Sequence, residues 1–325
     1  MTRPSLPRAL GARRAIRAAV LLAGCVLTPH SAAAHGIAGN RFFPATIATD
    51  DPAVADELSL PTLARFKTAD DPAAIETDIS SEYSKRITSR LGVSFADTWT
   101  ELATAGQPSH SGFQNLETTV KYQLLTNAPH EAIVSLGVSI EWGRTGAGGV
   151  GADAVSAITP TLYFGKGAGD LPEALSWARP FAITGVIGLQ TPTRAHQTLV
   201  TPDPITGAPV ATVQSTTRVL QTGLALEYSL AYLSAHVRDL GFPALINQIT
   251  PLVEVSLSSP LANGHGAGTT GTISPGLIWS GRHFQVGAEA MIPANRASGR
   301  AVGGVVQLHF FLDDLFPRSI GKPIL

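Results

Sequence analysis

The chain has 325 residues, of which only 14% are charged, and its formal net charge at neutral pH is −1. Soluble globular domains carry about 25% charged residues, so charge alone does not solvate this surface. The lack of a basic excess argues against nucleic acid as a partner, because that affinity depends on clustered cations that neutralise phosphates.

Residues 1–34 have the pattern of a bacterial export signal. Several arginines precede an apolar stretch at 18–28, and the small residues at 31–34 suit a signal peptidase. We therefore expect a signal peptide at 1–34 and a mature chain that begins at His35. Leu-Ala-Gly-Cys at 22–25 also matches the lipobox of bacterial lipoproteins, so acylation of Cys25 is the alternative. Cys25 is the only cysteine, and its removal would leave a mature chain without disulfides.

Apolar and polar residues alternate strictly in most of the chain beyond residue 57. Residues 35–56, in contrast, show no clear period, and we interpret them as an N-terminal extension. Successive side chains of a strand point to opposite faces, so the alternation predicts strands with one apolar and one polar face. The predicted strands are 58–68, 75–88, 91–102, 115–125, 132–142, 155–164, 181–190, 219–233, 249–258, 272–279, 283–292 and 304–312.

These twelve segments predict an all-β fold, a transmembrane antiparallel β-barrel over residues 57–313 followed by a C-terminal tail at 314–325. No stretch after the leader approaches the 18 apolar residues of a membrane-spanning helix, and bacterial barrels have even strand numbers. The longer Gly-rich connections 143–154, 191–215 and 259–271 would be extracellular loops. The connection 280–282 would be a tight periplasmic turn, and 171–178 a short helix. Half-exposed strands of a soluble β protein alternate in the same way, so that class stays open.

Aromatic residues near strand ends are typical of the belts at a membrane interface. We expect Trp142, Tyr163, Trp279 and Phe311 to form such belts.

On each strand, the residues that alternate with the apolar ones would face the lumen. Among them, negative charges outnumber positive charges. Eight carboxylates accompany two fixed cations, which would make a narrow pore negative and favour cations. In the alternative, these groups pair with one another or with Arg218 and Arg282 and simply fill the barrel. The lumen and selectivity candidates are Glu76, Asp78, Glu82, Arg86, Glu117, Lys121, Glu141, Glu227, Glu254, Glu289 and His309.

Motifs for catalysis or cofactor binding are weak. A mature N-terminal His35 could offer an imidazole and an α-amine to copper, but no second histidine stands at a short spacing. Ser280 and His283 are close in sequence without a Gly-x-Ser-x-Gly element, so an outer-membrane phospholipase is not indicated. We expect no enzyme activity, no cofactor and no metal, with His35 as the one candidate ligand.

The C-terminal run His309-Phe310-Phe311-Leu312-Asp313-Asp314, with Phe316-Pro317 and Gly321-Lys322-Pro323, resembles a group of proteobacterial outer-membrane proteins. Their relatives are named for the meta-pathway of phenol degradation and labelled as transporters. Residues 115–117, 122–129 and 164–172 match the same group. The resemblance implies an outer-membrane barrel and brings no catalytic or binding residues.

We therefore predict a channel or transporter for small solutes in the outer membrane of a Gram-negative bacterium. Its partners would be membrane lipid and lipopolysaccharide, small-molecule solutes and the barrel-assembly machinery. One alternative is a non-conducting barrel with a structural or adhesive role. The other is a lipid-anchored or periplasmic soluble β protein.

Overall fold

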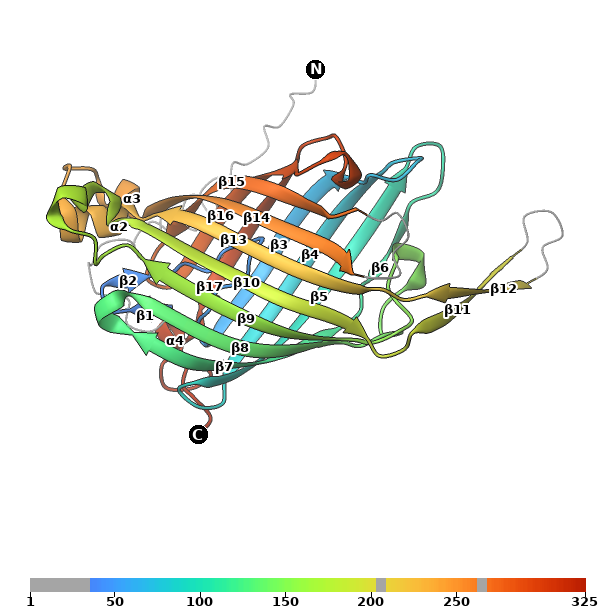
Figure 1. Ribbon diagram of the computed structural model, residues 1–325, viewed down its shortest axis with the longest axis horizontal. Coiled ribbons are helices and arrows are strands. Elements are labelled where there is room, and N and C mark those ends of the chain that lie inside the picture. The colour runs from blue at the N-terminus through green and yellow to red at the C-terminus, as the bar shows by residue number, and fades with distance from the viewer. Residues whose placement is uncertain (1–35, 203–208, 262–267) are drawn as a thin grey trace, which may run out of the picture. The chain divides into compact units, whose positions relative to one another are not determined.

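The computed structural model describes residues 36–202, 209–261 and 268–325, and its main feature is a closed β-barrel (Figure 1). Twelve antiparallel strands form the wall, each paired with the next wall strand along the chain, and the last pairs with the first. The predicted antiparallel β-barrel of twelve strands is confirmed. The wall strands are β3 (Glu57–Lys67), β4 (Ala74–Arg86), β5 (Leu91–Thr104), β7 (Glu117–Asn127), β8 (Ala132–Glu141), β9 (Ala157–Gly167), β10 (Phe181–Pro192), β13 (Arg218–Tyr228), β14 (Ile249–Leu261), β15 (Thr270–Ser280), β16 (Phe284–Pro293) and β17 (Gly303–Phe311).

Short elements lie between or beside the wall strands. The strands outside the wall are β1 (Ile37–Ala38), β2 (Arg41–Phe42), β6 (His110–Phe113), β11 (His196–Pro202) and β12 (Pro209–Ser215). The short helices are η1 (Ala128–His130), η2 (Gly148–Val150), η3 (Glu173–Ala178), α2 (Leu230–Tyr232), η4 (Leu233–Val237), α3 (Ala244–Asn247), η5 (Arg296–Ser298) and α4 (Leu312–Leu315). Among the described residues, no helix is long and apolar enough to cross a membrane.

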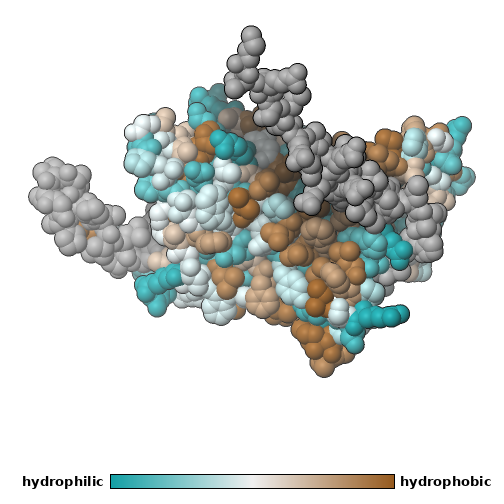
Figure 2. Space-filling model, turned by 180° about the vertical axis from the view of Figure 1, so that it is seen from behind, coloured by the Kyte–Doolittle hydropathy of each residue, from teal (hydrophilic) through white to brown (hydrophobic). Residues whose placement is uncertain are grey.

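The wall presents apolar side chains outward and polar side chains inward. On β8, Leu136 is 47% exposed and Val138 is similarly exposed, whereas Ser135 is fully buried and Ser139 nearly so. Figure 2 shows hydrophobic side chains gathered over the middle of one side of the wall. A soluble domain buries its apolar residues and exposes its polar ones, and this barrel does the reverse, as expected for a wall whose outer solvent is hydrocarbon.

The two ends of the barrel differ. We call the end where β3 begins and β17 ends the plug end, and the opposite one the loop end. The plug end carries the tight turn 281–283, the short helices η1, η3, α2 and α3, and the terminal α4 (Figure 1). The loop end carries the connection 142–156 and the hairpin β11–β12. Short turns face the periplasm in barrels of this class. Three plug-end connections, 87–90, 128–131 and 281–283, are short, whereas 168–180 and 229–248 are long and contain the helices.

Two predicted segments differ from the structure. The strand expected at 219–233 ends at Tyr228, because Ser229 caps a helix by accepting a hydrogen bond from the backbone N–H of Tyr232. The long connection expected at 191–215 contains the hairpin β11–β12, which the turn-like composition did not indicate. The short helix expected at 171–178 is present as η3.

Residues 36–56, which we call the plug, lie inside the barrel at the plug end. Ala38, Phe43 and Ala53 of the plug form one buried apolar cluster with Ile133 of β8 and Ala182 of β10. Wall glycines make room for the plug: a Cβ at Gly165 would lie 3.1 Å from Pro52 Cγ and 3.2 Å from Phe43 Cε1, and one at Gly287 only 2.7 Å from Ile47 Cδ1. The N-terminal extension therefore fills part of the lumen.

Candidate functional site: a plugged polar lumen

The backbone of the plug is hydrogen-bonded by side chains of the wall. Glu254 Oε1 accepts from the N–H of Ile47 at 2.8 Å, and Gln123 Oε1 accepts from the N–H of Val54 at 3.3 Å. Ser135 Oγ donates to the carbonyl of Pro52 at 2.5 Å, and Gln285 Nε2 donates to the carbonyl of Ala45 at 2.5 Å. Because residues 45–54 of the plug lie beyond the β1–β2 pair and belong to no strand, these wall side chains supply hydrogen bonds to their backbone.

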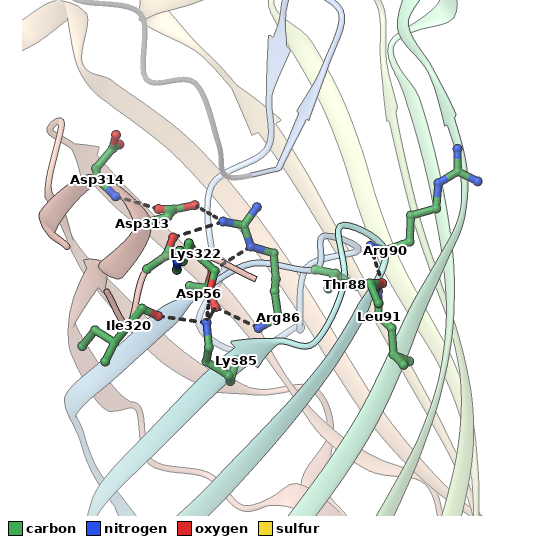
Figure 3. A network of polar contacts seen from close by, with 12 residues as sticks. Asp56, Lys85, Arg86, Thr88, Arg90, Leu91, Asp313, Asp314, Ile320 and Lys322 are labelled. Carbon is green, nitrogen blue, oxygen red and sulfur yellow. Dashed lines mark hydrogen bonds and ion pairs between the residues drawn. The ribbon is translucent and has the colours of Figure 1, made fainter. Parts of the chain in front are cut away.

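A first ionic anchor holds the C-terminal end of the plug (Figure 3). Asp56 is fully buried, and its carboxylate accepts from Lys85 Nζ at 2.5 Å and from Arg86 Nε at 2.7 Å. Arg86 also contacts Asp313 at 3.4 Å, and Lys85 Nζ donates to the carbonyls of Ile320 and Lys322. This anchor joins the plug, β4 and the C-terminal tail at one point.

A second anchor holds the N-terminal end of the plug. Arg41 is almost fully buried, and its Nε donates to Glu131 Oε2 at 3.2 Å. The Tyr232 hydroxyl donates to Glu131 Oε1 at 2.8 Å, and the Arg41 guanidinium lies 3.9 Å from the centre of the Tyr232 ring. Burial and the neighbouring Glu131 carboxylate raise the pKa of Tyr232 to about 12. Arg41 further donates to two carbonyls of the β9–β10 connection, so the plug is tied to the turns of its own end of the barrel.

The middle of the plug carries two adjacent acids that face Lys121 of β7. Lys121 Nζ donates to Asp50 Oδ2 at 2.8 Å and to the carbonyl of Asp51 at 2.9 Å. Burial raises the pKa of Asp51 to about 7, and the nearby Glu57 adds to this, whereas Lys121 opposes it. A carboxyl that titrates near neutrality therefore lies where the plug meets the wall.

Four of the predicted lumen residues lie at the loop end, and all four are acidic. We call Glu76, Asp78, Glu117 and Glu141 the loop-end acids. Glu117 and Glu141 are directly opposite each other on β7 and β8. Two like charges in this position repel, which lowers stability unless a cation or a proton lies between them.

Neutral side chains surround the loop-end acids. Thr100 Oγ1 donates to Asp78 at 2.6 Å. Asn115 and Gln190 donate to the two carboxylate oxygens of Glu141 at 2.9 and 3.3 Å. These amides and hydroxyls orient the carboxylates and leave their negative charge in place.

The other seven predicted lumen residues lie deeper, from the middle of the barrel to the plug end. Arg86 and Lys121, the two predicted fixed cations, form ion pairs with acids of the plug. The remaining five are Glu82, Glu227, Glu254, Glu289 and His309. The charge count expected from the strands alone was therefore incomplete, because the plug adds Arg41, Asp50, Asp51 and Asp56 to the lumen.

Three of these deep carboxylates lie on strands β13, β14 and β16. Glu227, Glu254 and Glu289 are buried, and Thr184 Oγ1 donates to Glu227 at 3.1 Å. Among the described residues, Glu254 Oε2 and both carboxylate oxygens of Glu289 have no hydrogen-bond partner apart from the contact of these two carboxyl groups with each other. Arg218 and Arg282, the loop arginines considered as partners, are solvent-exposed.

Two of the four residues expected in interfacial aromatic belts point inward instead. Tyr163 is 4% exposed and its ring lies 4.4 Å from Lys121 Nζ, while Phe311 is 1% exposed and packs edge-on against Phe42 of the plug. That prediction was wrong for both, because nearness to a strand end does not decide which face a side chain takes. Trp142 is exposed on the outer face, and Trp279 contacts the Phe284 ring.

A cavity of about 280 Å³ separates part of the plug from β3, β4, β5, β7 and β17. Polar wall residues on its surface include Ser59, Glu82, Lys121, Gln307 and His309. His309 Nδ1 lies 2.8 Å from Ser59 Oγ, and its Nε2 lies 3.4 Å from Glu57. The cavity is the described space in which a small polar solute would meet both the plug and the wall.

No group of three or more histidine, cysteine, aspartate or glutamate side chains within the described ranges could hold a metal ion. His35, Cys25 and the expected signal peptide lie outside the residues that the structure describes. The plug residues Arg41, Asp50 and Asp56, and Glu131, the partner of Arg41, were not among the predicted site residues. A charged residue within an aperiodic segment that follows an export signal was the only available hint.

No protein-family model matches the chain, and no curated protein matches its sequence. The membership suggested by the C-terminal motif therefore stays a prediction. The fold is similar to that of the COG4313 outer membrane channel from Pseudomonas putida F1, with a TM-score of 0.55 and 9% sequence identity over 82% of this chain and 99% of that chain. The NanC and KdgM porins each give a TM-score of 0.43 and 10% identity over 78% of this chain and 98% of theirs. The similarity to the COG4313 channel shows that the chain has the fold of an outer-membrane β-barrel.

Proposed function

We propose that this protein is an outer-membrane channel for small solutes and that it favours cations over anions. The observation that carries the proposal is the inverted wall, apolar outside and polar inside, together with the loop-end acids. An apolar outer surface requires a bilayer, and a polar interior solvates small hydrophilic molecules. Export through a signal peptide at 1–34, assembly by the barrel-assembly machinery and contact with lipopolysaccharide belong to the same proposal.

Cation preference would arise at the loop end, where a solute first meets the wall. Glu117 is exposed to solvent and faces Glu141 across one strand pair. Their repulsion is relieved when a cation lies between them, so the local concentration of cations rises and that of anions falls. The plug would then narrow the path through the deeper half of the lumen.

The test measures conductance and reversal potential of the full chain in planar bilayers under a salt gradient. We expect a cation-selective conductance in the wild type and a permeability ratio close to one in the Glu117→Gln/Glu141→Gln double variant. Glu173→Gln, at an exposed carboxylate in the plug-end connection, is the matched control and should keep the wild-type ratio. Folding is verified beforehand by heat-modifiable migration on gels.

Absence of conductance from correctly folded protein would refute the channel. It would also leave the non-conducting barrel as the better interpretation. An unchanged permeability ratio in the double variant would refute only the role of the loop-end acids in cation preference and would leave the channel itself in place. Fractionation of cells provides the separate test of location in the outer membrane.

A further inference from the structure

The size of the cavity between the plug and the wall limits what it can bind. Its volume of about 280 Å³ is just below the roughly 300–1,000 Å³ of pockets for drug-sized ligands. A water occupies about 30 Å³ of liquid, so the cavity holds on the order of ten water-sized groups. Any organic occupant is therefore small.

The two ammonium groups on its surface are already engaged. Lys85 Nζ donates to Asp56, Ile320 and Lys322, which uses all three of its N–H groups. Lys121 Nζ donates to Asp50 and to the carbonyl of Asp51, and it also lies 4.4 Å from the centre of the Tyr163 ring. Neither lysine is available to neutralise an anionic ligand.

Hydrogen-bond acceptors, in contrast, remain available. Gln307 is only 9% exposed, and its Nε2 donates to Thr62 Oγ1 at 3.1 Å, which fixes the orientation of the amide. Gln307 Oε1 is buried without a hydrogen-bond partner among the described residues, although the side chain lines the cavity. A buried acceptor without a donor is unfavourable because it has lost its hydrogen bonds to water, and a ligand that donates a hydrogen bond removes this cost.

The carboxylates on the cavity surface add negative charge. Glu82 of β4 accepts a long hydrogen bond from Ser84 Oγ, at 3.4 Å, and a second one from the Ser94 hydroxyl of β5. The Asp50 side chain is 48% exposed, and Lys121 Nζ donates to its Oδ2 only. A ligand that enters this space therefore meets Glu82, Asp50 and Gln307, which are two carboxylates and one amide oxygen.

We propose that this cavity binds a small organic cation, a primary ammonium compound whose N–H groups donate to Gln307 Oε1 and to the carboxylates of Glu82 and Asp50. The inference rests on the proposed function, since it names the class of solute that a cation-favouring channel would take. An ammonium group matches the excess of acceptors, and its charge matches the carboxylates. A dianion of the same length would meet two lysines that are already engaged and would be repelled by the carboxylates of Glu82 and Asp50.

The experiment is isothermal titration of the folded full chain in detergent with three four-carbon probes: putrescine, 1,4-butanediol and succinate. We expect saturable binding of putrescine, at least about tenfold weaker binding of the diol, and no binding of succinate. A tenfold change corresponds to about 1.4 kcal/mol. Equal binding of the diol or of succinate would overturn the assignment of the ligand class.

Two variants locate the site. Glu82→Gln and Gln307→Leu should each weaken putrescine binding about tenfold. Gln221→Leu, at a wall glutamine that is not part of the cavity surface, should change it less than twofold. Unchanged binding in both cavity variants would place the ligand elsewhere and refute the proposal. If a cavity variant fails to migrate as a folded barrel, protection of wild-type Asp50 from carbodiimide labelling by putrescine takes its place, and lack of protection counts against the site.

The outcome is separable from that of the channel test. Conductance without putrescine binding would remove this site and leave the channel. Putrescine binding without conductance would keep the site and remove the channel.

Discussion

Charged side chains have different roles in the loop half and the plug half of the lumen. At the loop end the predicted lumen residues are Glu76, Asp78, Glu117 and Glu141, and the hydrogen bonds to Asp78, Glu117 and Glu141 come from hydroxyls and amides. At the plug half, Arg86 and Lys121 are matched by the plug acids Asp56 and Asp50. The loop half therefore keeps uncompensated negative charge, whereas in the plug half these two cations are compensated by acids of the plug.

This contrast assigns ion selectivity to the loop half of the lumen and closure of the path to the plug half. Uncompensated carboxylates attract cations from solution, but they do not hold a segment in place. Ion pairs that are withdrawn from water hold a segment in place, and they present little field to solutes because each charge has a close opposite partner. Substitutions in the plug half should therefore change how open the barrel is, and substitutions in the loop half should change which ions it prefers.

The largest effect is expected from Asp56→Asn at the first anchor. Breaking a fully buried ion pair costs about 3–5 kcal/mol, and somewhat less applies here because Lys85 and Arg86 keep slight exposure. The plug should then leave its position more often. We expect a severalfold rise in single-channel conductance and faster proteolysis within residues 36–56.

Asp170→Asn is the control for this anchor. Asp170 also accepts from a lysine, Lys166, but it lies at the surface of the plug end and does not touch the plug. The conductance and protease resistance of the Asp170→Asn variant should stay at the wild-type level. Wild-type conductance in the Asp56 variant would mean that the plug does not control the path.

A smaller effect is expected from pH, acting through Asp51. In the docked plug the pKa of Asp51 is raised to about 7 by burial, with Glu57 and Asp50 adding to the shift and Lys121 opposing it. When the plug leaves, the carboxyl returns to its ordinary pKa of about 3.9. Between these values the docked plug retains a proton that the released plug loses, so docking weakens as pH rises from about 4 to about 7 and is constant above that range.

Conductance should therefore increase between pH 5 and pH 8, and Asp51→Asn should flatten this dependence at the acidic, more closed level. The asparagine imitates the protonated side chain and cannot ionise. Thr46→Val, also in the plug but without a titratable group, should retain the wild-type pH profile. A profile that Asp51→Asn leaves unchanged would assign the titration to another group.

The wall could be predicted from the sequence, because the face that a strand residue takes is a local property. The alternation at 132–142 identifies Leu136 and Val138 as outward and Ser135 as inward without any knowledge of neighbouring strands. The same rule would have placed Tyr163 correctly, since it shares its parity with Thr159 and Thr161. The assignment to an aromatic belt followed the position along the strand instead, and it failed for that reason.

The position of the plug could not be predicted, because the contacts that hold it in the lumen are not local. Its backbone groups are held by wall residues far away in sequence, such as Glu254 with Ile47 and Gln285 with Ala45. Such a segment needs no hydrophobic period of its own, so residues 35–56 carry no pattern that differs from a surface extension. Arg86 and Lys121 form their ion pairs with the plug, so the prediction of their roles was incomplete for the same reason.

The smallest effect is expected from Asp78→Asn at the loop end. Thr100 Oγ1 donates to this carboxylate at 2.6 Å, and an asparagine oxygen can accept the same hydrogen bond, so the wall should keep its structure. One of four loop-end acids is lost while the plug anchors are untouched. We expect a modest fall in cation preference at low salt, no change at 1 M salt where the Debye length is about 3 Å, and an unchanged pH profile. A change in conductance as large as that of Asp56→Asn would show that the two halves are coupled, and the separation of selection from closure would then be wrong.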